Sequence, residues 1–498
     1  MNTQHIKLGL GDVNVCAQTP GCLPVNIFGG PGTLTQDMLS WITVTTKDSS
    51  QQTIDVISAN FTGPLAEWDA GTLAFATGVE HRRYAGSFTP DQIRVDGASN
   101  DSSASPVSGV YSVDEIYGEL SIPITQRLET SVALRDSNYD NFGTENNAKF
   151  GVKWKVIDDL LLRASWSQGF RAPVIGELQG FGNYGAPVYD QCNFNNPNMN
   201  PTLQAQCDAL GLPASLEYVQ NNTQITVAVG GNPDLGPESS TTEVAGLVYS
   251  PAEIKGLDIE WTYYHHKIDD AVVAPDSQNT LDNCRINGPT STYCQRITRN
   301  PVTGQIIRWT GRLDNIGEIE TSGYDFRINW KSEVEGGSVQ MKFQLTHVIG
   351  YRAVDQDGGV FSRTVGVEEN DGSIPRNVAD MSILYELGDW TIGLTNRYTS
   401  RLVELCGVGG QFVGEGICSD ESAGQFGQNA IKSAVFTDLQ MAWNQPFAIS
   451  GMLLKFGINN VLDKDPPACF TCSLNGYDAS TYNLQGQYYY LQMAYRPN

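Results

Sequence analysis

The sequence predicts an all-β protein, an antiparallel up-and-down β-barrel that crosses a membrane with its strands. Three patterns indicate this fold: segments that alternate between apolar and polar residues, links between them that are alternately short and long, and ten cysteines in close pairs. Aromatic residues make up 10% and charged residues only 17% of the chain, as in many large β proteins. No stretch approaches the roughly 20 apolar residues of a spanning helix, so a membrane crossing must use strands.

The clearest alternation lies in residues 149–156. Phe150, Val152, Trp154 and Val156 share one face of a strand, and three lysines occupy the other face. The same period recurs in residues 115–124, 128–135, 257–264, 324–330, 339–345, 390–398 and 454–458. A soluble β-sandwich also alternates in this way, so the period alone leaves both architectures open.

The links between the predicted strands, counted from Gly71 onward, favour the barrel. The short links are residues 125–127, 157–158, 251–255, 333–337, 388–389 and 445–450. The long links are residues 87–109, 172–239, 271–308, 354–374, 402–432 and 463–486, with 140–146 as a modest exception. In an up-and-down barrel, alternate links lie at the same end. Tight turns at one end and long loops at the other are typical of outer-membrane barrels.

The ten cysteines form five pairs that are close in sequence. These are Cys16 with Cys22, Cys192 with Cys207, Cys284 with Cys294, Cys406 with Cys418, and Cys469 with Cys472. Each pair lies among turn-forming residues, which predicts loop disulfides in an oxidising compartment. Four pairs fall in long links, and the first pair precedes the first counted strand. Cys469 and Cys472 also have the spacing of a zinc or redox motif, but no histidine lies at a ligand spacing from them, so we favour the disulfide.

Charge and the N-terminus narrow the class of protein further. The formal net charge of -24 argues against nucleic acid as a partner, because phosphate binding depends on clustered Lys and Arg. The segment that begins at Met1 lacks the features of a secretory signal, so either a signal has been removed or the chain begins inside a larger protein, and we favour the second. Six tryptophans near predicted strand ends suit the aromatic girdles of a membrane barrel, although a soluble core would also use them. They are Trp154, Trp166, Trp261, Trp330, Trp390 and Trp443.

Four motifs resemble those of TonB-dependent outer-membrane receptors. Residues 165–178 resemble the segment where an upward strand ends and a long outer loop begins, and residues 232–238 resemble the motif that closes this loop. Residues 458–464 resemble the motif of the penultimate strand, and residues 78–83 an earlier strand motif. The matching residues are Gly169, Phe170, Arg171, Ala172, Pro173, Glu177 and Leu178, then Asn232, Pro233, Leu235, Pro237 and Glu238, and finally Asn459, Asn460 and Asp463. The motifs follow the family's order, and the resemblance extends from about Gly71 to the end.

The resemblance implies a barrel of about 22 strands with an N-terminal plug domain. The sequence holds about 15 or 16 strand candidates and no plug-like segment. We therefore interpret residues 1–498 as one partial barrel domain. Its open edges would leave unpaired backbone groups in lipid, so the chain alone is not expected to form a closed pore. The last predicted strand is followed by Arg496, Pro497 and Asn498, whereas the family usually ends on an aromatic residue.

No motif in the sequence predicts catalysis. A nucleophile elbow, a phosphate loop and a metalloprotease motif are all missing. His265 and His266 follow the end of an alternating segment, where a satisfied or exposed histidine is the expected state. The acidic residues Asp269, Asp270, Glu368, Glu369 and Asp371 are interpreted as solvated loop acids, with a glycosidase-like carboxylate pair as the open alternative.

The resemblance then implies an importer in the outer membrane of a Gram-negative bacterium, with no enzyme activity and no cofactor. Its expected partners are the inner-membrane TonB complex in the full-length receptor, a small-molecule nutrient and outer-membrane lipid. The nutrient could be a siderophore, a vitamin or an oligosaccharide. Two alternatives stay open: a passive porin-like channel or surface adhesin, and a secreted β-rich enzyme that processes glycans.

Overall fold

The computed structural model describes most of the 498-residue chain. The described residues are 1–101, 103–221, 224–275, 277–355, 364–368, 372–406, 416–423, 427–472 and 476–496.

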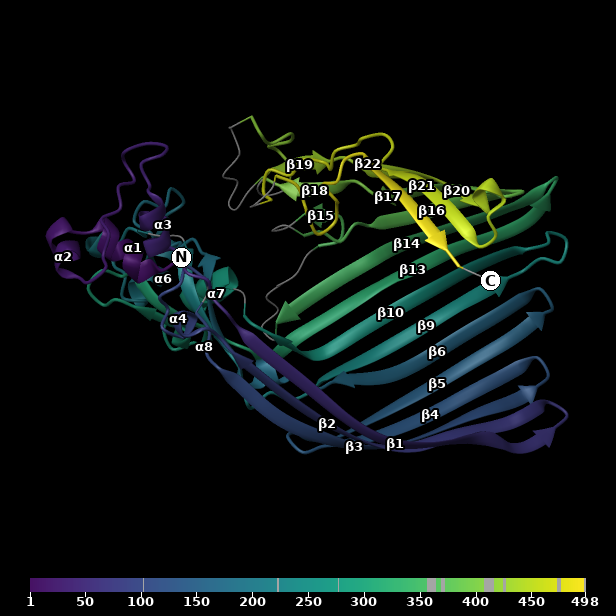
Figure 1. Cartoon of the computed structure of the whole chain (residues 1–498). Coiled ribbons are helices and arrows are strands. Elements are labelled where there is room, and N and C mark those ends of the chain that lie inside the picture. Colours follow the sequence, from purple (N-terminus) through teal and green to yellow (C-terminus); the bar gives the residue numbers. More distant parts are fainter. Residues whose placement is uncertain are drawn as a thin grey trace.

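A single curved sheet of 15 strands dominates the structure (Figure 1). Its strands, in spatial order, are β1 (Ser49–Trp68), β2 (Gly71–Thr89), β3 (Val107–Thr125), β4 (Leu128–Tyr139), β5 (Gly143–Ile157), β6 (Leu160–Arg171), β9 (Glu238–Tyr249), β10 (Leu257–Val273), β13 (Asp314–Val334), β14 (Gly337–Asp355), β16 (Asn377–Leu387), β17 (Trp390–Thr399), β20 (Ala434–Asn444), β21 (Met452–Asn459) and β22 (Tyr488–Tyr495). Every neighbouring pair in this sheet is antiparallel, so the topology is up-and-down as predicted.

The connections separate into two kinds at the two ends of the sheet. Tight turns such as those at Gly336 and Gly388 join strands at one end, and both glycines adopt the positive φ that such turns require. The long connections and the helices collect at the opposite end (Figure 1). The predicted asymmetry between short and long links is therefore present in the structure.

The long connections contain secondary structure of their own, although the sequence predicted loops there. A four-stranded sheet combines β7 (Phe181–Pro187), β8 (Gln224–Gly230), β11 (Ile297–Arg299) and β12 (Ile306–Arg312), and a three-stranded sheet combines β15 (Val367–Glu368), β18 (Leu402–Leu405) and β19 (Gln428–Ile431). The helices are α1 (Thr3–Leu10), α2 (Val13–Gln18), α3 (Gln36–Ile42), α4 (Gln92–Val95), α5 (Ile175–Gln179), α6 (Pro201–Ala209), α7 (Ser277–Asn287) and α8 (Thr292–Gln295), with 3₁₀ turns at Ala214–Leu216 and Pro446–Ala448. Within the described residues, no helix has the length and apolarity to cross a membrane.

The two faces of the sheet differ in chemistry. Val132, Phe150 and Trp166 are direct cross-strand neighbours on the outward face, where Phe150 and Trp154 are 47% and 48% exposed. A β-sandwich would bury these side chains against a second sheet, so the exposed apolar face excludes that alternative. On the inward face of the same strands, Lys149 lies opposite Ser167. The structure thus has the alternation of a membrane barrel, apolar outside and polar inside.

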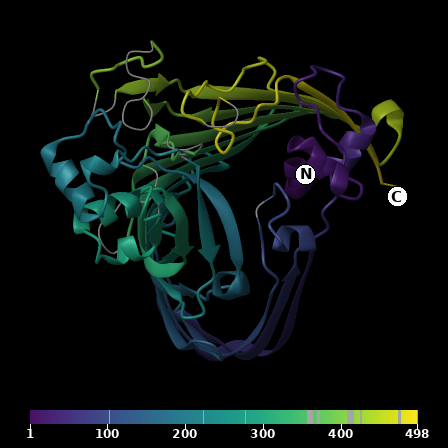
Figure 2. The same ribbon diagram turned by 90° about the vertical axis from the view of Figure 1, so that its left-hand side faces the viewer.

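The two edge strands are β1 and β22, and the sheet between them forms an open trough (Figure 2). Among the described residues, no backbone ladder joins these two strands. Strand β1 had not been identified from the sequence, because its apolar residues Ile54, Val56 and Ile57 fall on both faces. All three side chains are more than half exposed.

Leu394 and Thr395 provide a matched test of the two faces in strand β17. Leu394 lies on the outward face between Ile383 and Leu439, and Thr395 lies inward between Ser382 and Asp438. In lipid vesicles, Leu394→Arg should lower the free energy of unfolding by about 2–4 kcal/mol, the cost of a charge facing the bilayer interior. Thr395→Arg, at the same depth, should change it by less than about 1 kcal/mol. Denaturant titration measures both values, and equal losses would contradict the assignment of the faces.

Candidate functional site

The inward face near the loop end carries a buried charge network. The Glu115 carboxylate, whose side chain is 3% exposed, accepts hydrogen bonds from Arg82 at 2.5 Å, from Arg135 at 2.8 Å and from the Ser137 hydroxyl at 2.7 Å. Two guanidinium groups and a hydroxyl compensate the desolvation of this single carboxylate. The network fixes three neighbouring strands, β2, β3 and β4, below the loops.

Aromatic rings continue this inward face toward the loops, and the rings of Tyr84, Tyr111 and Tyr139 are called the aromatic wall below. The ring centroids of Tyr84 and Tyr111 lie 4.9 Å apart in a stacked pair, and those of Tyr111 and Tyr139 lie 6.2 Å apart. The Arg82 guanidinium lies 5.9 Å from the centre of the Tyr84 ring. Tyr84 and Tyr111 line a cavity of about 530 Å³ that helix α5 also borders. Stacked rings at the edge of a cavity offer flat, rigid contact surfaces to a ligand.

Arg171 joins the first two family motifs directly. Its guanidinium donates two hydrogen bonds to Glu177, at 2.8 and 3.0 Å, and one to Glu238 at 2.5 Å. The same two carboxylates accept backbone N–H groups, Glu177 from Val174 at 2.8 Å and Glu238 from Val272 at 2.7 Å. Arg171 therefore ties together both ends of the long connection between β6 and β9.

Asn232 links the connection between β6 and β9 to the end of the connection between β10 and β13. Its side-chain amide donates to the carbonyl of Leu313 at 3.0 Å and to the Asp314 carboxylate at 3.2 Å, and its side-chain oxygen accepts the Asp234 N–H at 2.9 Å. Arg312 also donates to Asn232 and forms an ion pair with Asp234 at 2.8 Å. Because Asn232 is only 5% exposed, these contacts replace water almost completely.

The third motif closes the last connection of the sheet. Asn460 donates its N–H to Asp438 at 2.8 Å and accepts the Lys464 N–H at 2.9 Å, and Asp463 accepts the Gln487 N–H at 2.8 Å. Asn460 and Asp463 both have φ near 48°, a left-handed conformation that short polar side chains tolerate.

The remaining motif residues support these anchors by packing. The ring of Phe170 meets that of Tyr139 edge to face at 5.7 Å, and Gly169 leaves room for the Ser240 hydroxyl. Pro173 and Leu235 are buried, Ala172, Leu178 and Pro237 are half-buried, Pro233 is exposed, and Asn459 lies on the inward face at the end of β21. In the structure, the motif residues thus hold the bases of the loops.

The aromatic wall and the Glu115 network were not predicted from the sequence, because only the cross-strand register brings their residues together.

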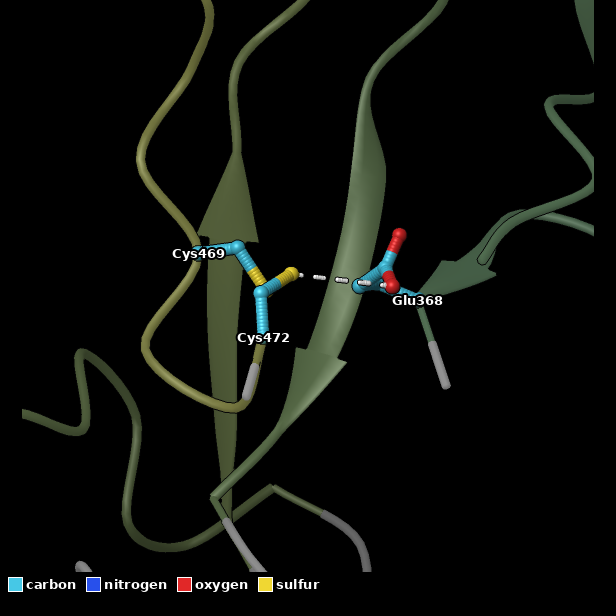
Figure 3. Close-up of side chains that lie close together, drawn as sticks. All are labelled: Glu368, Cys469 and Cys472. Carbon is cyan, nitrogen blue, oxygen red and sulfur yellow. Dashed lines mark hydrogen bonds between the residues drawn. A yellow bond between two sulfur atoms is a disulfide. The ribbon is translucent and has the colours of Figure 1, made fainter. Parts of the chain in front are cut away.

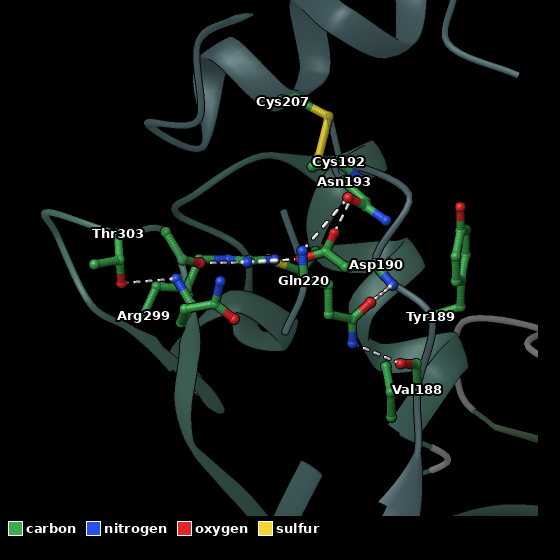
Figure 4. Close-up of polar contacts among 12 residues, drawn as sticks. Val188, Tyr189, Asp190, Cys192, Asn193, Cys207, Gln220, Arg299 and Thr303 are labelled. Atoms are coloured by element: carbon green, nitrogen blue, oxygen red, sulfur yellow. Dashed lines mark hydrogen bonds and ion pairs between the residues drawn. A yellow bond between two sulfur atoms is a disulfide. The ribbon is translucent and has the colours of Figure 1, made fainter. Parts of the chain in front are cut away.

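A compact loop unit surrounds a buried ion pair (Figure 4). Asp190 and Arg299 lie 2.7 Å apart with side chains 2% and 14% exposed. Gln220 accepts the Asp190 N–H at 2.9 Å and donates to the Val188 carbonyl at 2.8 Å. Burial raises the pKa of the neighbouring Tyr218 hydroxyl, and the Asp190 carboxylate raises this pKa further while Arg299 opposes the rise. The disulfide between Cys192 and Cys207 closes this unit.

A second loop unit surrounds the disulfide between Cys469 and Cys472 (Figure 3). Glu404, 1% exposed, accepts the Thr471 N–H at 2.5 Å and its hydroxyl at 2.9 Å. Glu368 is 2% exposed, so its interpretation as a solvated loop acid was wrong, because β15 carries it into this unit. Residues 369–371 lie outside the described residues. Glu368 and both cysteines are grouped like metal ligands, but the disulfide occupies both sulfur atoms.

All ten cysteines lie at disulfide distance in the five pairs of sequence neighbours. Besides the two pairs already described, these are Cys16 with Cys22, Cys284 with Cys294, and Cys406 with Cys418. Several half-cystines lie in short helices and not in irregular loops, namely Cys16, Cys207, Cys284 and Cys294.

The histidine pair lies within β10, which extends nine residues beyond the predicted segment ending at residue 264. His265 bonds to Glu320 at 2.9 Å on one face, and His266 contacts the Thr242 hydroxyl at 3.1 Å on the other. Because their side chains lie on opposite faces, the two imidazoles do not form a common site.

Substitution of Arg171 tests its role as a loop anchor. Arg171→Ala should lower the free energy of local opening of residues 172–180 and 231–238 by about 2 kcal/mol. The reason is that the charge-assisted hydrogen bonds to Glu177 and Glu238 are lost. Amide hydrogen exchange there should become about thirtyfold faster. Arg171→Lys keeps the charge without the forked geometry and should give an intermediate rate. Unchanged exchange in Arg171→Ala would contradict the role.

Removal of a disulfide tests the first loop unit. The double substitution Cys192→Ser with Cys207→Ser should destabilise this unit by about 3 kcal/mol, because the bond closes a loop of 15 residues. Limited proteolysis should then cut residues 188–220 first. The matched control is Cys16→Ser with Cys22→Ser, which should leave this cleavage unchanged. Equal cleavage in both variants would contradict a local effect.

Comparison with known proteins identifies the family to which this architecture belongs. The family model described as "TonB dependent receptor-like, beta-barrel" matches residues 22–461. No curated protein sequence is significantly similar to the chain.

Several solved structures share the fold. A mutant of the ferric enterobactin receptor from Pseudomonas aeruginosa has a TM-score of 0.58 at 13% identity, covering 90% of this chain and 54% of its own. The siderophore receptor PirA from Acinetobacter baumannii also has a TM-score of 0.58 at 13% identity, with 91% and 56% covered. For the FrpB iron transporter from Neisseria meningitidis the TM-score is 0.51 at 14% identity, with 90% and 55% covered.

The chain spans a little more than half the length of these structures. The family match covers most of the chain, and the 15-stranded antiparallel sheet is the partial barrel that the motifs predicted. The chain belongs to the family of TonB-dependent receptor-like β-barrels, which are transporters of the Gram-negative outer membrane.

Proposed function

We propose that the chain forms the wall and the ligand-collecting mouth of a receptor that imports a scarce small-molecule nutrient. The observation that carries this proposal is the arrangement of the sheet, apolar outward and polar inward, with the long connections gathered at one end. The outward face suits lipid, and the inward face suits a water-filled passage or a plug domain.

The loop units support ligand capture at the mouth. Disulfides and buried ion pairs hold these connections in shape before a ligand arrives, which reduces the ordering cost of binding. Tyr84 and Tyr111 present their stacked rings beside helix α5, in the cavity of about 530 Å³. A small molecule that enters from the loop end would meet this wall first.

Energy coupling belongs to the complete receptor in this proposal. Family membership supports coupling to the inner-membrane TonB complex, which would release the ligand inward. The ligand is a siderophore, a vitamin or an oligosaccharide. The structural neighbours include a ferric enterobactin receptor mutant in complex with enterobactin, which supports a small molecule as ligand.

A binding experiment tests the receptor function. The purified chain in detergent is titrated with ferric enterobactin, ferric citrate, cobalamin and neutral oligosaccharides, and the change in tryptophan fluorescence is followed. We expect saturable binding of one of these. Tyr84→Ala with Tyr111→Ala should weaken it about tenfold, because two stacking surfaces are lost.

The matched control is Val110→Ala. Val110 precedes Tyr111, lies on the outward face and is 58% exposed, so its loss should not change the affinity. If no probe binds to the folded protein, the receptor function is wrong and a passive channel becomes the better account. Binding that ignores both tyrosines would remove them from the site.

A further inference from the structure

A second cavity, of about 500 Å³, lies on the inward face at the loop end of β16, β17, β20 and β21. We infer that the two cavities at the mouth take an uncharged, polyhydroxylated ligand such as a short oligosaccharide, and not an anionic metal chelate. This inference rests on the proposed function and names its substrate class. It is carried by the charge and the hydrogen-bonding groups of the residues that line both cavities.

The charged groups of the second cavity are two carboxylates and one guanidinium. Arg397 donates to Asp438 at 2.5 and 3.1 Å, so its charge is already paired. Asp380 is the cross-strand neighbour of Arg397, and its exposed carboxylate has no side-chain hydrogen bond or ion pair among the described residues. With two negative groups and one positive group, the lining has a net charge of -1.

The other polar groups of this lining are amides and hydroxyls. Asn459 contributes from the sheet, Asn483 and Gln485 contribute from the connection that precedes β22, and Thr481 adds a hydroxyl. Phe436 supplies an aromatic ring on the same inward face. Each hydroxyl of a sugar donates one hydrogen bond and accepts others, and this set of amides, carboxylates and a guanidinium offers both kinds of partner.

The lining of the first cavity, which includes Tyr84 and Tyr111, favours the same ligand class. Among the residues that the structure describes, its lining contains no Asp, Glu, Lys, Arg or His side chain, and its polar side chains on the inward face include Gln52, Tyr84 and Tyr111. An anionic chelate would lose its hydration here without gaining an unpaired cationic partner, because Arg82, beside the Tyr84 ring, already pairs with Glu115. A neutral polyol loses less hydration and can stack on the tyrosine rings. The formal charge of -24 on the chain adds further repulsion against an anion.

Calorimetric titration of the full chain in detergent tests the ligand class. The neutral probes are maltohexaose, cellohexaose, xylohexaose and chitohexaose, and the anionic probes are ferric enterobactin and ferric citrate. We expect one neutral probe to bind and both anionic probes to fail. Asp380→Ala and Asn483→Ala should each weaken binding about fivefold, the size of one lost hydrogen bond.

The control is Met381→Ala, because Met381 follows Asp380 but lies on the outward face beside Phe343. Its affinity should equal that of the unsubstituted chain. Binding of an anionic probe in place of the neutral ones would overturn the ligand class and leave the receptor function intact. Failure of every probe would overturn the ligand class, and the receptor function would then depend on the fluorescence titration, which includes cobalamin. Neutral binding that neither Asp380→Ala nor Asn483→Ala weakens would overturn the role of the second cavity.

Discussion

The two-residue alternation of the strands is the constraint on which the rest of the structure depends. Lipid offers no hydrogen bonds, so every backbone group in the bilayer must be paired within the sheet and every outward side chain must tolerate hydrocarbon. The rows through Val132, Phe150 and Trp166 and through Leu394 and Leu439 meet this requirement. Strands β1 and β22 meet it on their paired sides only. Among the described residues, the outer edge of each of these two strands has no strand partner.

The same alternation decides where a ligand can bind. If the outward face contacts lipid, the inward face must carry the polar chemistry, and the long connections at one end control access to it. Charged side chains hold the strands, the base of the longest connection and the loop unit in place. Glu115 fixes strands below the aromatic wall, Arg171 fixes the base of the longest connection, and Asp190 and Arg299 fix the loop unit above it. Disulfides then limit the shapes that the connections can adopt.

The sheet was predictable to a large extent because its period and its turns are local properties of the sequence. Strand β1 was missed because Ile54, Val56 and Ile57 do not alternate. The helices in the loops are short and depend on tertiary packing, so their sequences carry little periodic signal. Burial of Glu368 depends on partners distant in sequence. The motif residue Arg171 was identified by resemblance, but its link to Glu177 and Glu238 became visible only in the structure.

Spin labelling along β17 (Trp390–Thr399) tests the orientation of the faces most directly. Free cysteines are missing among the described residues, so single introduced cysteines can be labelled selectively. In lipid vesicles, labels at Ile392 and Leu394 should be accessible to dissolved oxygen, and labels at Thr391 and Thr395 to a water-soluble nickel chelate. Accessibility should therefore alternate with a period of two residues. Equal accessibility of both faces to the nickel chelate, with no preference for oxygen at any position, would contradict a lipid-facing sheet.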